Sequence, residues 1–322
     1  MQRALTGIQP SGQVHLGNYL GMIRPALELQ AGYAGYYFIA DYHALTTVRE
    51  PDLLRRSTLE AAATFLACGL DPDRVVFFRQ SAVPAVCELA WILACFTSNG
   101  TLFRGHAVKA AEQGGLDINA GTVFYPVLMS ADILLYDTHV VPVGLDQKQH
   151  VEIARDMAQR MNARFGDDTF VVPEVSIKAD VGLVSGLDGR KMSKSYGNTI
   201  PVFTSQKKLR KTIMKIVTDS KTVDEPKNPD DDNIFALFKL FGNADQIAEL
   251  RGRYEAGGMG YGDAKQALFE IVDEEISEAR ERYDDYMAHP ERVEEILADG
   301  AVRARAQADK TLTRVRSRVG LT

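Results

Sequence analysis

Two short stretches of the chain carry residues whose types and spacing suit the binding of a phosphate group. In the first, His15, Gly17 and Asn18 follow a predicted strand and a tight turn, at the point where a helix is expected to begin. Unpaired N–H groups and the helix dipole attract anions at such a position. Glycine lets a ligand approach the backbone, and the short polar side chains can donate hydrogen bonds. An ordinary first βα unit of an α/β domain would have the same pattern, so this stretch alone is not specific.

The second stretch is a lysine-containing segment, residues 189–195, in which Lys191 and Lys194 alternate with Ser193 and Ser195. Glycines at 182, 186, 189 and 197 predict a mobile loop. Lysine supplies point charge and serine supplies hydroxyl donors, so such a loop suits charge that develops on a transferring phosphoryl or nucleotidyl group. The alternative is a basic surface loop with no role in catalysis.

The elements that must position these stretches alternate between strand and helix over the first two-thirds of the chain. Apolar runs predict strands over 3–6, 35–40, 75–78 and 139–143. Helical patterns are expected from 15, from 51 to about 69, and over 84–96, 120–135 and 147–165. This alternation predicts a Rossmann-like α/β fold with a parallel sheet and ligands at the strand carboxyl ends. Polar clusters at 9–18, 41–43 and 144–147 follow strands or begin helices, and are expected to converge on one crevice.

The pattern changes after about Pro201, where helical segments follow one another almost without strand signals. These helices are expected over 205–217, 234–241, 244–254, 264–287 and 290–319. The sequence therefore predicts a Rossmann-like catalytic domain over residues 1–200, which ends with the lysine loop, and an α-helical C-terminal domain over 201–322. The last helices of that domain are expected to be able to pack back on the catalytic domain.

Composition excludes several classes of protein. Hydrophobic residues make up 45% and charged residues 25% of the chain, as in ordinary globular proteins. The net charge of -6 argues against a general nucleic-acid coat protein. Cys68, Cys87 and Cys95 form no Cys-x-x-Cys pair, which disfavours structural zinc and suits a reducing cytoplasm. There is no signal peptide pattern or long apolar run, so no membrane span is expected, and the single tryptophan, Trp91, is expected in a core or an interface.

The two stretches together resemble the paired signature of class I aminoacyl-tRNA synthetases. The signature consists of Lys-Met-Ser-Lys-Ser at 191–195 and His-Leu-Gly-Asn at 15–18, with Asn18 in place of the second His of the family motif. Thr-Gly-Ile-Gln-Pro-Ser-Gly at 6–12, Met-Ser-Ala-Asp-Ile-Leu at 129–134 and Val-Gly-Leu-Asp-Gln-Lys-Gln-His at 143–150 are similar to tryptophanyl-tRNA synthetases. The resemblance extends from about Ala4 to the end of the chain, and the sister family of tyrosyl-tRNA synthetases is the main competitor.

The resemblance implies a cytoplasmic, homodimeric enzyme that uses ATP and Mg²⁺. It would activate L-tryptophan with ATP to give tryptophanyl-adenylate and pyrophosphate, and then transfer the amino acid to tRNA(Trp). The amino acid carboxylate is the nucleophile, so positioning and charge stabilisation would carry most of the rate. The residues implied as catalytic are Gln9, Asn18, Lys191 and Lys194.

The residues that the resemblance assigns to ATP come from several segments. His15, Gly17 and Asn18 would hold ATP, Gln9 would lie near the α-phosphate, and the adenosine would contact Gly144 and Asp146. Met192 and Ser193 would bind the adenine side, and the lysines of the loop the pyrophosphate. The full implied set is Gln9, Ser11, His15, Gly17, Asn18, Lys109, Gly144, Asp146, Gln147, Lys191, Met192, Ser193 and Lys194. Family members commonly carry a further lysine two positions after Lys109, where this chain has Ala111, so Lys109, Arg104 or Lys148 would replace it or ATP would bind more weakly.

The amino acid pocket must accept indole, an apolar ring with one N–H donor. The family pattern assigns the acceptor to Asp132, the ring contacts to Met129 and Val143, and the amino group to Tyr125 and Gln147. The full implied set is Leu5, Gly7, His43, Tyr125, Met129, Asp132, Val141, Val143 and Gln147. From the residues alone, Met129 could belong to the core, His43 could be a structural histidine, and Asp132 could pair with an arginine. His150 and Glu152 are expected to belong to the helix scaffold.

Basic residues suggest contacts with RNA phosphates at two places. One is the run from Lys207 to Lys215 next to the lysine loop, and the other is the last helix, where a solvated charged face is an equal alternative. Two other functions stay open. A nucleotidyltransferase that makes a coenzyme precursor would share the N-terminal motif, but would not need the helical domain. A synthetase-derived regulatory protein would have lost aminoacylation.

Overall fold

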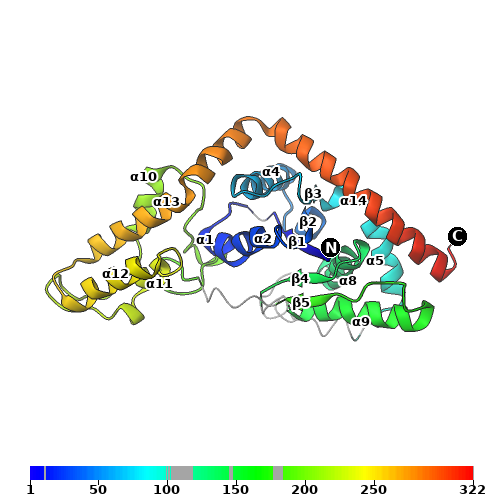
Figure 1. Ribbon diagram of the computed structural model, residues 1–322, viewed down its shortest axis with the longest axis horizontal. Helices are drawn as coiled ribbons and strands as arrows, with labels where there is room; N and C mark the ends of the chain where they lie inside the picture. Colours follow the sequence, from blue (N-terminus) through cyan, green and yellow to red (C-terminus); the bar gives the residue numbers. More distant parts are fainter. Residues whose placement is uncertain are drawn as a thin grey trace. The chain divides into compact units, whose positions relative to one another are not determined.

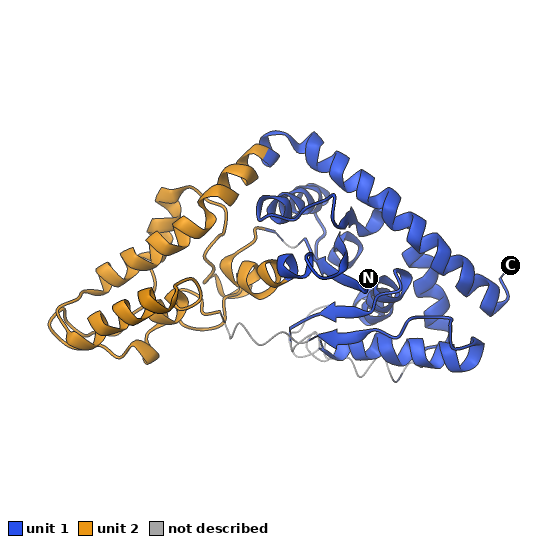
Figure 2. Cartoon of the chain, in the orientation of Figure 1, with its two compact units in different colours: residues 1–12, 26–178, 286–322 blue, residues 13–25, 179–285 orange. Residues whose placement is uncertain are grey.

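The computed structural model describes residues 1–10, 12–98, 100, 102, 119–144, 148–176 and 184–321. The chain forms two compact units (Figure 2). Unit 1 contains residues 1–12, 26–178 and 286–322, and unit 2 contains residues 13–25 and 179–285. The predicted division at residue 200 does not follow these units. The last helix belongs to unit 1, whereas residues 13–25 group with the lysine loop.

Unit 1 contains a five-stranded sheet whose neighbouring strands are all parallel (Figure 1). The strands are β1 (Arg3–Ile8), β2 (Ala34–Ile39), β3 (Val76–Arg79), β4 (Val140–Pro142) and β5 (Glu174–Ser176), in the order β3-β2-β1-β4-β5. β2 is buried almost throughout, as expected of a strand covered on both faces. The predicted α/β fold with a parallel sheet is confirmed. β5 was not predicted, because three residues with only one large apolar side chain give no strand signal.

The helices of unit 1 fill the connections between strands. They are α2 (Arg24–Leu29, which begins in unit 2), α3 (Asp41–Ala44), α4 (Pro51–Ala67), α5 (Ala85–Cys95), α8 (Ala120–Leu135), α9 (Lys148–Phe165) and α14 (Pro290–Val319), with the 3₁₀ turn η2 (Gln80–Ala82). The predicted positions of α4, α5, α8, α9 and α14 are confirmed, and the bounds of α8 and α14 agree with those expected, whereas α3 and η2 were not predicted. One apolar cluster joins strands and helices through side chains such as Phe78, Leu89, Val127 and Ala154. Because β2, β1 and β4 are adjacent, Gln9, residues 41–43 and Gly144 follow neighbouring strand ends.

The long helix α14 packs against β3 and helices α4, α5 and α8 of the same unit (Figure 1). It approaches the sheet closely at Gly300. A Cβ atom added to Gly300 would lie 1.7 Å from the carbonyl oxygen of Phe77 in β3. Only glycine permits this contact, because the atom it would meet belongs to the backbone and cannot rotate away.

Gly300→Ala is therefore expected to lower the free energy of unfolding by about 3 kcal/mol, since β3 or α14 must move. Gly252→Ala in helix α12 (Ala244–Ala256) is the matched control, because an added Cβ there meets nothing within 4 Å. That change is expected to be neutral or to stabilise the helix by up to about 1 kcal/mol. Urea unfolding of both variants measures the difference. Equal stabilities would contradict the close packing of α14 on β3.

Unit 2 contains the first helical turns of the chain and a set of helices that follow the lysine loop. The first turns are α1 (Leu16–Asn18) and the π-helix η1 (Tyr19–Ile23). The others are η4 (Lys194–Tyr196), α10 (Gln206–Ile213), η5 (Pro229–Asp231), α11 (Asn233–Phe238), α12 and α13 (Tyr261–Ala288, whose last residues lie in unit 1). α10 ends before its predicted limit of Val217, whose N–H donates instead to the Leu187 carbonyl at 2.8 Å. Within the described ranges, no helix is long and apolar enough to cross a membrane.

Candidate functional site

The stretch around His15, which is predicted to bind phosphate, is joined in unit 2 to the segment that follows the lysine loop. The Leu16 N–H donates to the Ile200 carbonyl at 2.9 Å, and the Val202 N–H donates to the Val14 carbonyl at 3.1 Å. His15 and Pro201 form an isolated antiparallel bridge between these bonds. The stretch around His15 is thus held by tertiary pairing as well as by its own helix.

The two predicted motifs also contact each other directly within unit 2. The Gly17 N–H donates to Sδ of Met192, at 3.3 Å. A Cβ atom added to Gly17 would lie 3.0 Å from the His15 ring and 3.5 Å from Cβ of Met192. In this arrangement the space beside Gly17 is therefore occupied by two other predicted ATP residues.

His15 and Asn18 are oriented by the start of the helix. The Asn18 amide oxygen accepts from the His15 backbone N–H at 3.3 Å, so the amide NH₂ is the part of Asn18 left to meet a ligand. His15 is buried, and its Nδ1 has no hydrogen-bond partner among the described residues. Burial, and then the positive charge of Lys194, lower the pKa of His15 from 6.5 to about 4. His15 is therefore neutral at pH 7.

The imidazole signal of His15 in an NMR titration is expected to have its midpoint at about pH 4. The spectrum of a His15→Gln variant assigns the signal among those of the six histidines. Because unfolded His15 has the higher pKa, the unfolded state binds more protons between about pH 4 and 6.5, and His15 lowers stability as the pH falls through this range. A midpoint near 6.5 would contradict the buried, neutral ring.

The lysine loop is organised by one buried side chain, Asn198, which is 3% exposed. Its amide oxygen accepts from the Ser193 N–H at 2.8 Å, and its NH₂ donates to the Lys191 carbonyl at 3.1 Å and to Oδ1 of Asp188 at 2.7 Å. Its backbone carbonyl accepts from the Leu187 N–H at 2.9 Å. Asn198 thus ties both sides of the loop together, and the residues it fixes include the backbone of Lys191 and Ser193.

The predicted cations of the loop lie at its surface, whereas Met192, another predicted ATP residue, is buried. Lys191 and Lys194 are exposed, and the hydroxyls of Ser193 and Ser195 are 2.8 Å apart. Gly189 (φ 80°) and Gly197 (φ 63°) adopt the left-handed conformation that lets the chain turn at each end. Exposed cations and hydroxyl donors on a backbone fixed by hydrogen bonds form a surface suited to phosphate oxygens.

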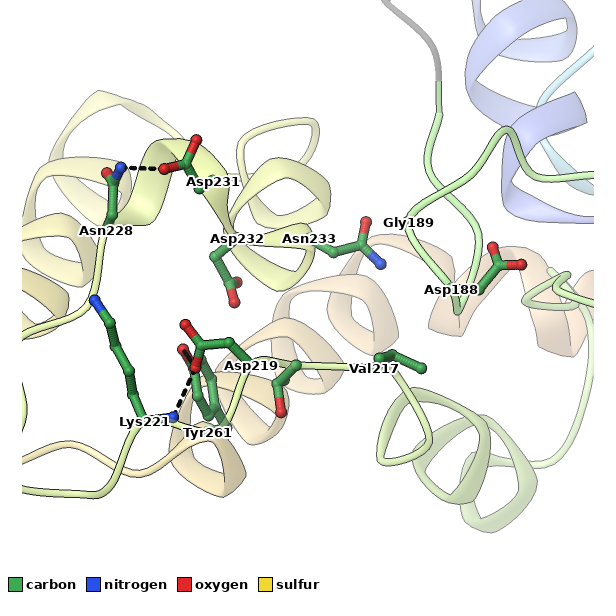
Figure 3. Close-up of a pocket in the computed structure, with 11 residues that line it drawn as sticks. Asp188, Gly189, Val217, Asp219, Lys221, Asn228, Asp231, Asp232, Asn233 and Tyr261 are labelled. Atoms are coloured by element: carbon green, nitrogen blue, oxygen red, sulfur yellow. Dashed lines mark hydrogen bonds between the residues drawn. The ribbon is translucent and has the colours of Figure 1, made fainter.

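A cavity of about 380 Å³ lies in unit 2 beside the start of this loop (Figure 3). Its lining includes Asp188, Asp219, Asp231 and Asp232, and the figure shows Asp219 bonded to Tyr261 and Asp231 bonded to Asn228. Each of these four carboxylates accepts a hydrogen bond from another group of the chain. Because groups of the chain itself donate to these carboxylates, the lining residues stabilise the structure beside the loop, and we assign the cavity no ligand.

Unit 1 contains the predicted indole acceptor, Asp132, whose side chain is 2% exposed. The Gln80 amide donates to both carboxylate oxygens, at 2.9 and 2.8 Å, and Nε2 of His43 lies 3.0 Å from Oδ2. Burial raises the pKa of Asp132, whereas the hydrogen bonds from His43 and Gln80 oppose that shift. No arginine pairs with Asp132 among the described residues. Oδ1 accepts from Gln80 alone among the described residues, so it retains acceptor capacity for a donor such as indole N–H.

The other predicted tryptophan residues that are described lie in or beside the apolar core of unit 1. Leu5 and Val141 are buried, and Met129 and Val143 are partly buried against the same apolar cluster. An added Cβ at Gly7 would lie 2.5 Å from the Phe38 ring. The Tyr125 hydroxyl lies 2.8 Å from Nε2 of His150, and the Tyr125 and His43 rings meet edge to face at 6.1 Å between centroids.

Some of the remaining predicted residues are described by the structure, and the others are not. Gln9 follows β1, and its amide donates to the His43 carbonyl at 3.3 Å, so the polar groups after β1 and β2 do meet. Gly144 follows β4 and is exposed. Lys148 pairs with Glu152 at 3.5 Å, as expected of the helix scaffold. The other predicted residues, Ser11, Arg104, Lys109, Ala111, Asp146 and Gln147, lie outside the described residues.

Comparison with known proteins shows the family of this chain. The family described as "tRNA synthetases class I (W and Y)" matches residues 1–277. The chain belongs to this family. It is 48% identical over 320 residues to the tryptophan–tRNA ligase of Rhodopirellula baltica, with 99% of both chains covered. The crystal structure of tryptophanyl-tRNA synthetase from Campylobacter jejuni complexed with ADP and tryptophan is 46% identical, covers 99% of this chain and 100% of its own, and gives a TM-score of 0.93. The resemblance predicted from the motifs is confirmed.

Three residues that were not predicted as site residues contact predicted ones in the structure. Gln80 binds Asp132, His150 contacts Tyr125, and Asn198 fixes the lysine loop. Gln80 directly follows β3, so the rule that selected Gln9 and His43 at strand ends would also have selected it. His150 was assigned to the scaffold, yet it is 6% exposed and reaches a predicted substrate residue. Asn198 had no sequence signal beyond its place just after the loop.

Proposed function

We propose that this chain is a tryptophan–tRNA ligase that activates L-tryptophan with ATP and transfers it to tRNA(Trp). The supporting observation is that the His15–Asn18 motif and the Lys191–Ser195 loop are in contact in unit 2, where the Gly17 N–H donates to Sδ of Met192. A buried carboxylate in unit 1, Asp132, supplies the acceptor that an indole ring needs. Identity of 48% to a tryptophan–tRNA ligase over nearly the whole chain supports both assignments.

In the first step, a carboxylate oxygen of tryptophan attacks the α-phosphorus of ATP. A new P–O bond forms, the bond from the α-phosphorus to the bridging oxygen breaks, and pyrophosphate leaves. The protein needs no nucleophile of its own, so its residues position the reactants and stabilise charge. We propose that Gln9 acts near the α-phosphate, that His15 and Asn18 hold ATP, and that Lys191 and Lys194 stabilise the departing pyrophosphate.

The second step transfers the activated amino acid to RNA. A ribose hydroxyl of the terminal adenosine of tRNA attacks the carbonyl carbon of the adenylate, the ester forms, and AMP leaves. The nucleophile again belongs to a substrate. Because substrates supply both nucleophiles, the proposed site is rich in cations and hydrogen-bond donors. Acid–base groups such as His43 and Asp132 would orient neighbouring side chains.

We propose that Mg²⁺ enters with ATP. The donors beside the lysine loop are N–H groups, ammonium groups and hydroxyls, which fit phosphate oxygens better than a cation. The described residues contain no group of three or more His, Cys, Asp or Glu side chains arranged to hold a metal ion. Phosphate oxygens and waters would then supply most of the ligands, and the chain would contribute the charges that balance the metal–nucleotide complex.

Tryptophan-dependent exchange of labelled pyrophosphate into ATP tests the proposed activation without RNA. We expect exchange with tryptophan and almost none with tyrosine. Exchange with tyrosine alone would overturn the choice of amino acid. The absence of exchange with either amino acid would favour a regulatory protein that has lost the activity.

We also propose that the chain is a homodimer in the cytoplasm. Trp91 on α5 is 69% exposed and lies between the exposed Cys87 and Cys95 on one helical face, so it is not a core residue. The three cysteines described are free thiols, which suits a reducing compartment. Sedimentation of the wild type and of a Trp91→Arg variant tests the dimer. A monomeric wild type would contradict the proposed dimer. A variant with unchanged association would show that the face of α5 around Trp91 is not the dimer interface.

A further inference from the structure

Residues 189–218 of unit 2 form a strongly basic segment. They include eight lysine and arginine residues and no aspartate or glutamate, although the whole chain has a formal net charge of -6. A local concentration of positive charge on an acidic chain attracts a polyanion that the rest of the surface repels. The segment begins with the lysine loop and continues through helix α10, beyond the residues that bind ATP in the proposed function.

Helix α10 presents its lysines to solvent because its other sides are occupied. Leu209 and Ile213 are fully buried, while Gln206 and Arg210 donate to Asp273 and Gln266 of α13, at 2.7 and 2.9 Å. The exposed lysines are Lys207, Lys208, Lys211 and, just after the helix, Lys215. We call these four residues the α10 lysine face. No ion pair or side-chain hydrogen bond engages their ammonium groups among the described residues.

The basic residues of the last helix, α14, are different. Five of its arginines bond to other groups of unit 1 and so fix the helix on that unit. These contacts join Arg303 to the Pro72 carbonyl, Arg305 to the Ala82 carbonyl, Arg314 to Asp137, Arg316 to Glu88 and Arg318 to Asp168. The two basic regions look alike in sequence, but five arginines of α14 have partners in unit 1, whereas the ammonium groups of the α10 lysine face have none among the described residues. The arginines of α14 are structural, whereas the α10 lysine face has free charge.

We propose that the α10 lysine face binds the sugar–phosphate backbone of the RNA substrate. This inference rests on the proposed function, in which tRNA is the acceptor of the activated amino acid. Lys207 and Lys211 are one helical turn apart, which separates their Cα atoms by about 6 Å along the axis and aligns them as a row of point charges. Lysines in such a row neutralise phosphates without reading sequence, so the face contributes affinity and orientation.

A membrane surface is a poorer occupant of this face. Helices that bind at a bilayer surface insert an apolar side into the lipid. The apolar side of α10 consists of Leu209 and Ile213, which are buried in the protein and unavailable. The exposed side offers charge and almost no apolar area, which fits a strongly hydrated polyanion.

The test compares a Lys207→Glu, Lys211→Glu double variant with the wild type in three measurements. Tryptophan-dependent pyrophosphate exchange is expected to stay within twofold, because this reaction does not involve RNA. The KM for tRNA(Trp) in aminoacylation is expected to rise about tenfold or more, since two phosphate contacts are replaced by repulsion. Between about 50 and 200 mM salt, the slope of log Kd for tRNA against log salt is expected to fall by about two.

Lys310→Glu in α14 is the matched control, because Lys310 is an exposed helical lysine outside the α10 lysine face. Its tRNA affinity is expected to stay within threefold of the wild type. Equal losses in the control and in a single Lys211→Glu variant would overturn the proposal, as would a double variant with wild-type affinity and salt slope. Loss of exchange in the double variant would also overturn it. So would binding of anionic lipid vesicles by the wild type, if the vesicles displace tRNA and the double variant no longer binds them. A wild type without tryptophan-dependent exchange would instead refute the proposed function.

Discussion

An Asp132→Ala variant is expected to lose most of its preference for tryptophan over phenylalanine in the exchange of pyrophosphate into ATP. Sites that hydrogen-bond a buried substrate donor reject analogues that lack it by about 10⁴-fold or more, and removal of the acceptor should leave about 10²-fold or less. The exchange rate with tryptophan is expected to fall by a comparable factor. The measurement is kcat/KM for each amino acid.

The physical reason is the environment of the Asp132 carboxylate. It is almost completely buried, and Gln80 and His43 fix its orientation with hydrogen bonds of 2.8 to 3.0 Å. A phenyl ring would leave the spare acceptor capacity of Oδ1 buried without a donor, which costs about 1 to 3 kcal/mol or more for a charged group. In Asp132→Ala this penalty disappears, and the pocket distinguishes the two rings by size alone.

A tryptophan analogue in which sulfur replaces the indole N–H provides the decisive control. The wild type is expected to reject 3-benzothienylalanine strongly, and Asp132→Ala is expected to treat it almost like tryptophan. Asp132→Asn, which keeps the volume and one oxygen acceptor, separates this effect from a packing defect. If Asp132→Ala still prefers the N–H form by the wild-type factor, Asp132 is not the indole acceptor.

The residues that were predicted correctly share a local signal. Strands such as Ala34–Ile39 are continuous apolar runs, and helices such as Ala120–Leu135 repeat their apolar residues at helical spacing, so their positions follow from the sequence. Parallel strands place their carboxyl ends at one edge, which is why Gln9 and His43 were expected to meet and do so. Gln80 follows the same rule, because it comes directly after β3.

The features that could not be predicted depend on pairing between distant segments. Residues 13–25 group with unit 2 because residues 14–16 hydrogen-bond to residues 200–202, and no local pattern encodes that pairing. The end of α10 moves to Ile213 for a similar reason, since the Val217 N–H is taken by the Leu187 carbonyl. Asn198 looks like any polar loop residue until its partners at 188, 191 and 193 are known.

An Asn198→Ala variant is expected to lower kcat/KM for ATP in the exchange reaction by about 10²-fold, with little change in the KM for tryptophan. The side chain joins the Ser193 N–H, the Lys191 carbonyl and the Asp188 carboxylate, so its loss releases both sides of the lysine loop. A displacement of about 1 Å in catalytic groups can cost about 10²-fold in rate. The effect is therefore expected on the step in which, by our proposal, Lys191 and Lys194 contact the pyrophosphate.

Asn228→Ala is the matched control, because Asn228 is an exposed asparagine of the same unit whose NH₂ donates to Asp231 at 2.5 Å. It is expected to exchange pyrophosphate at nearly the wild-type rate. Asn198→Asp retains an acceptor for the Ser193 N–H but loses both donors and faces Asp188, so it should be impaired almost as much as Asn198→Ala. Thermal unfolding distinguishes this positioning role from a general loss of structure. A fully active Asn198→Ala, or an equal rise in KM for tryptophan and ATP, would mean that the loop is not positioned through Asn198, because only the ATP-dependent step requires the two lysines in place.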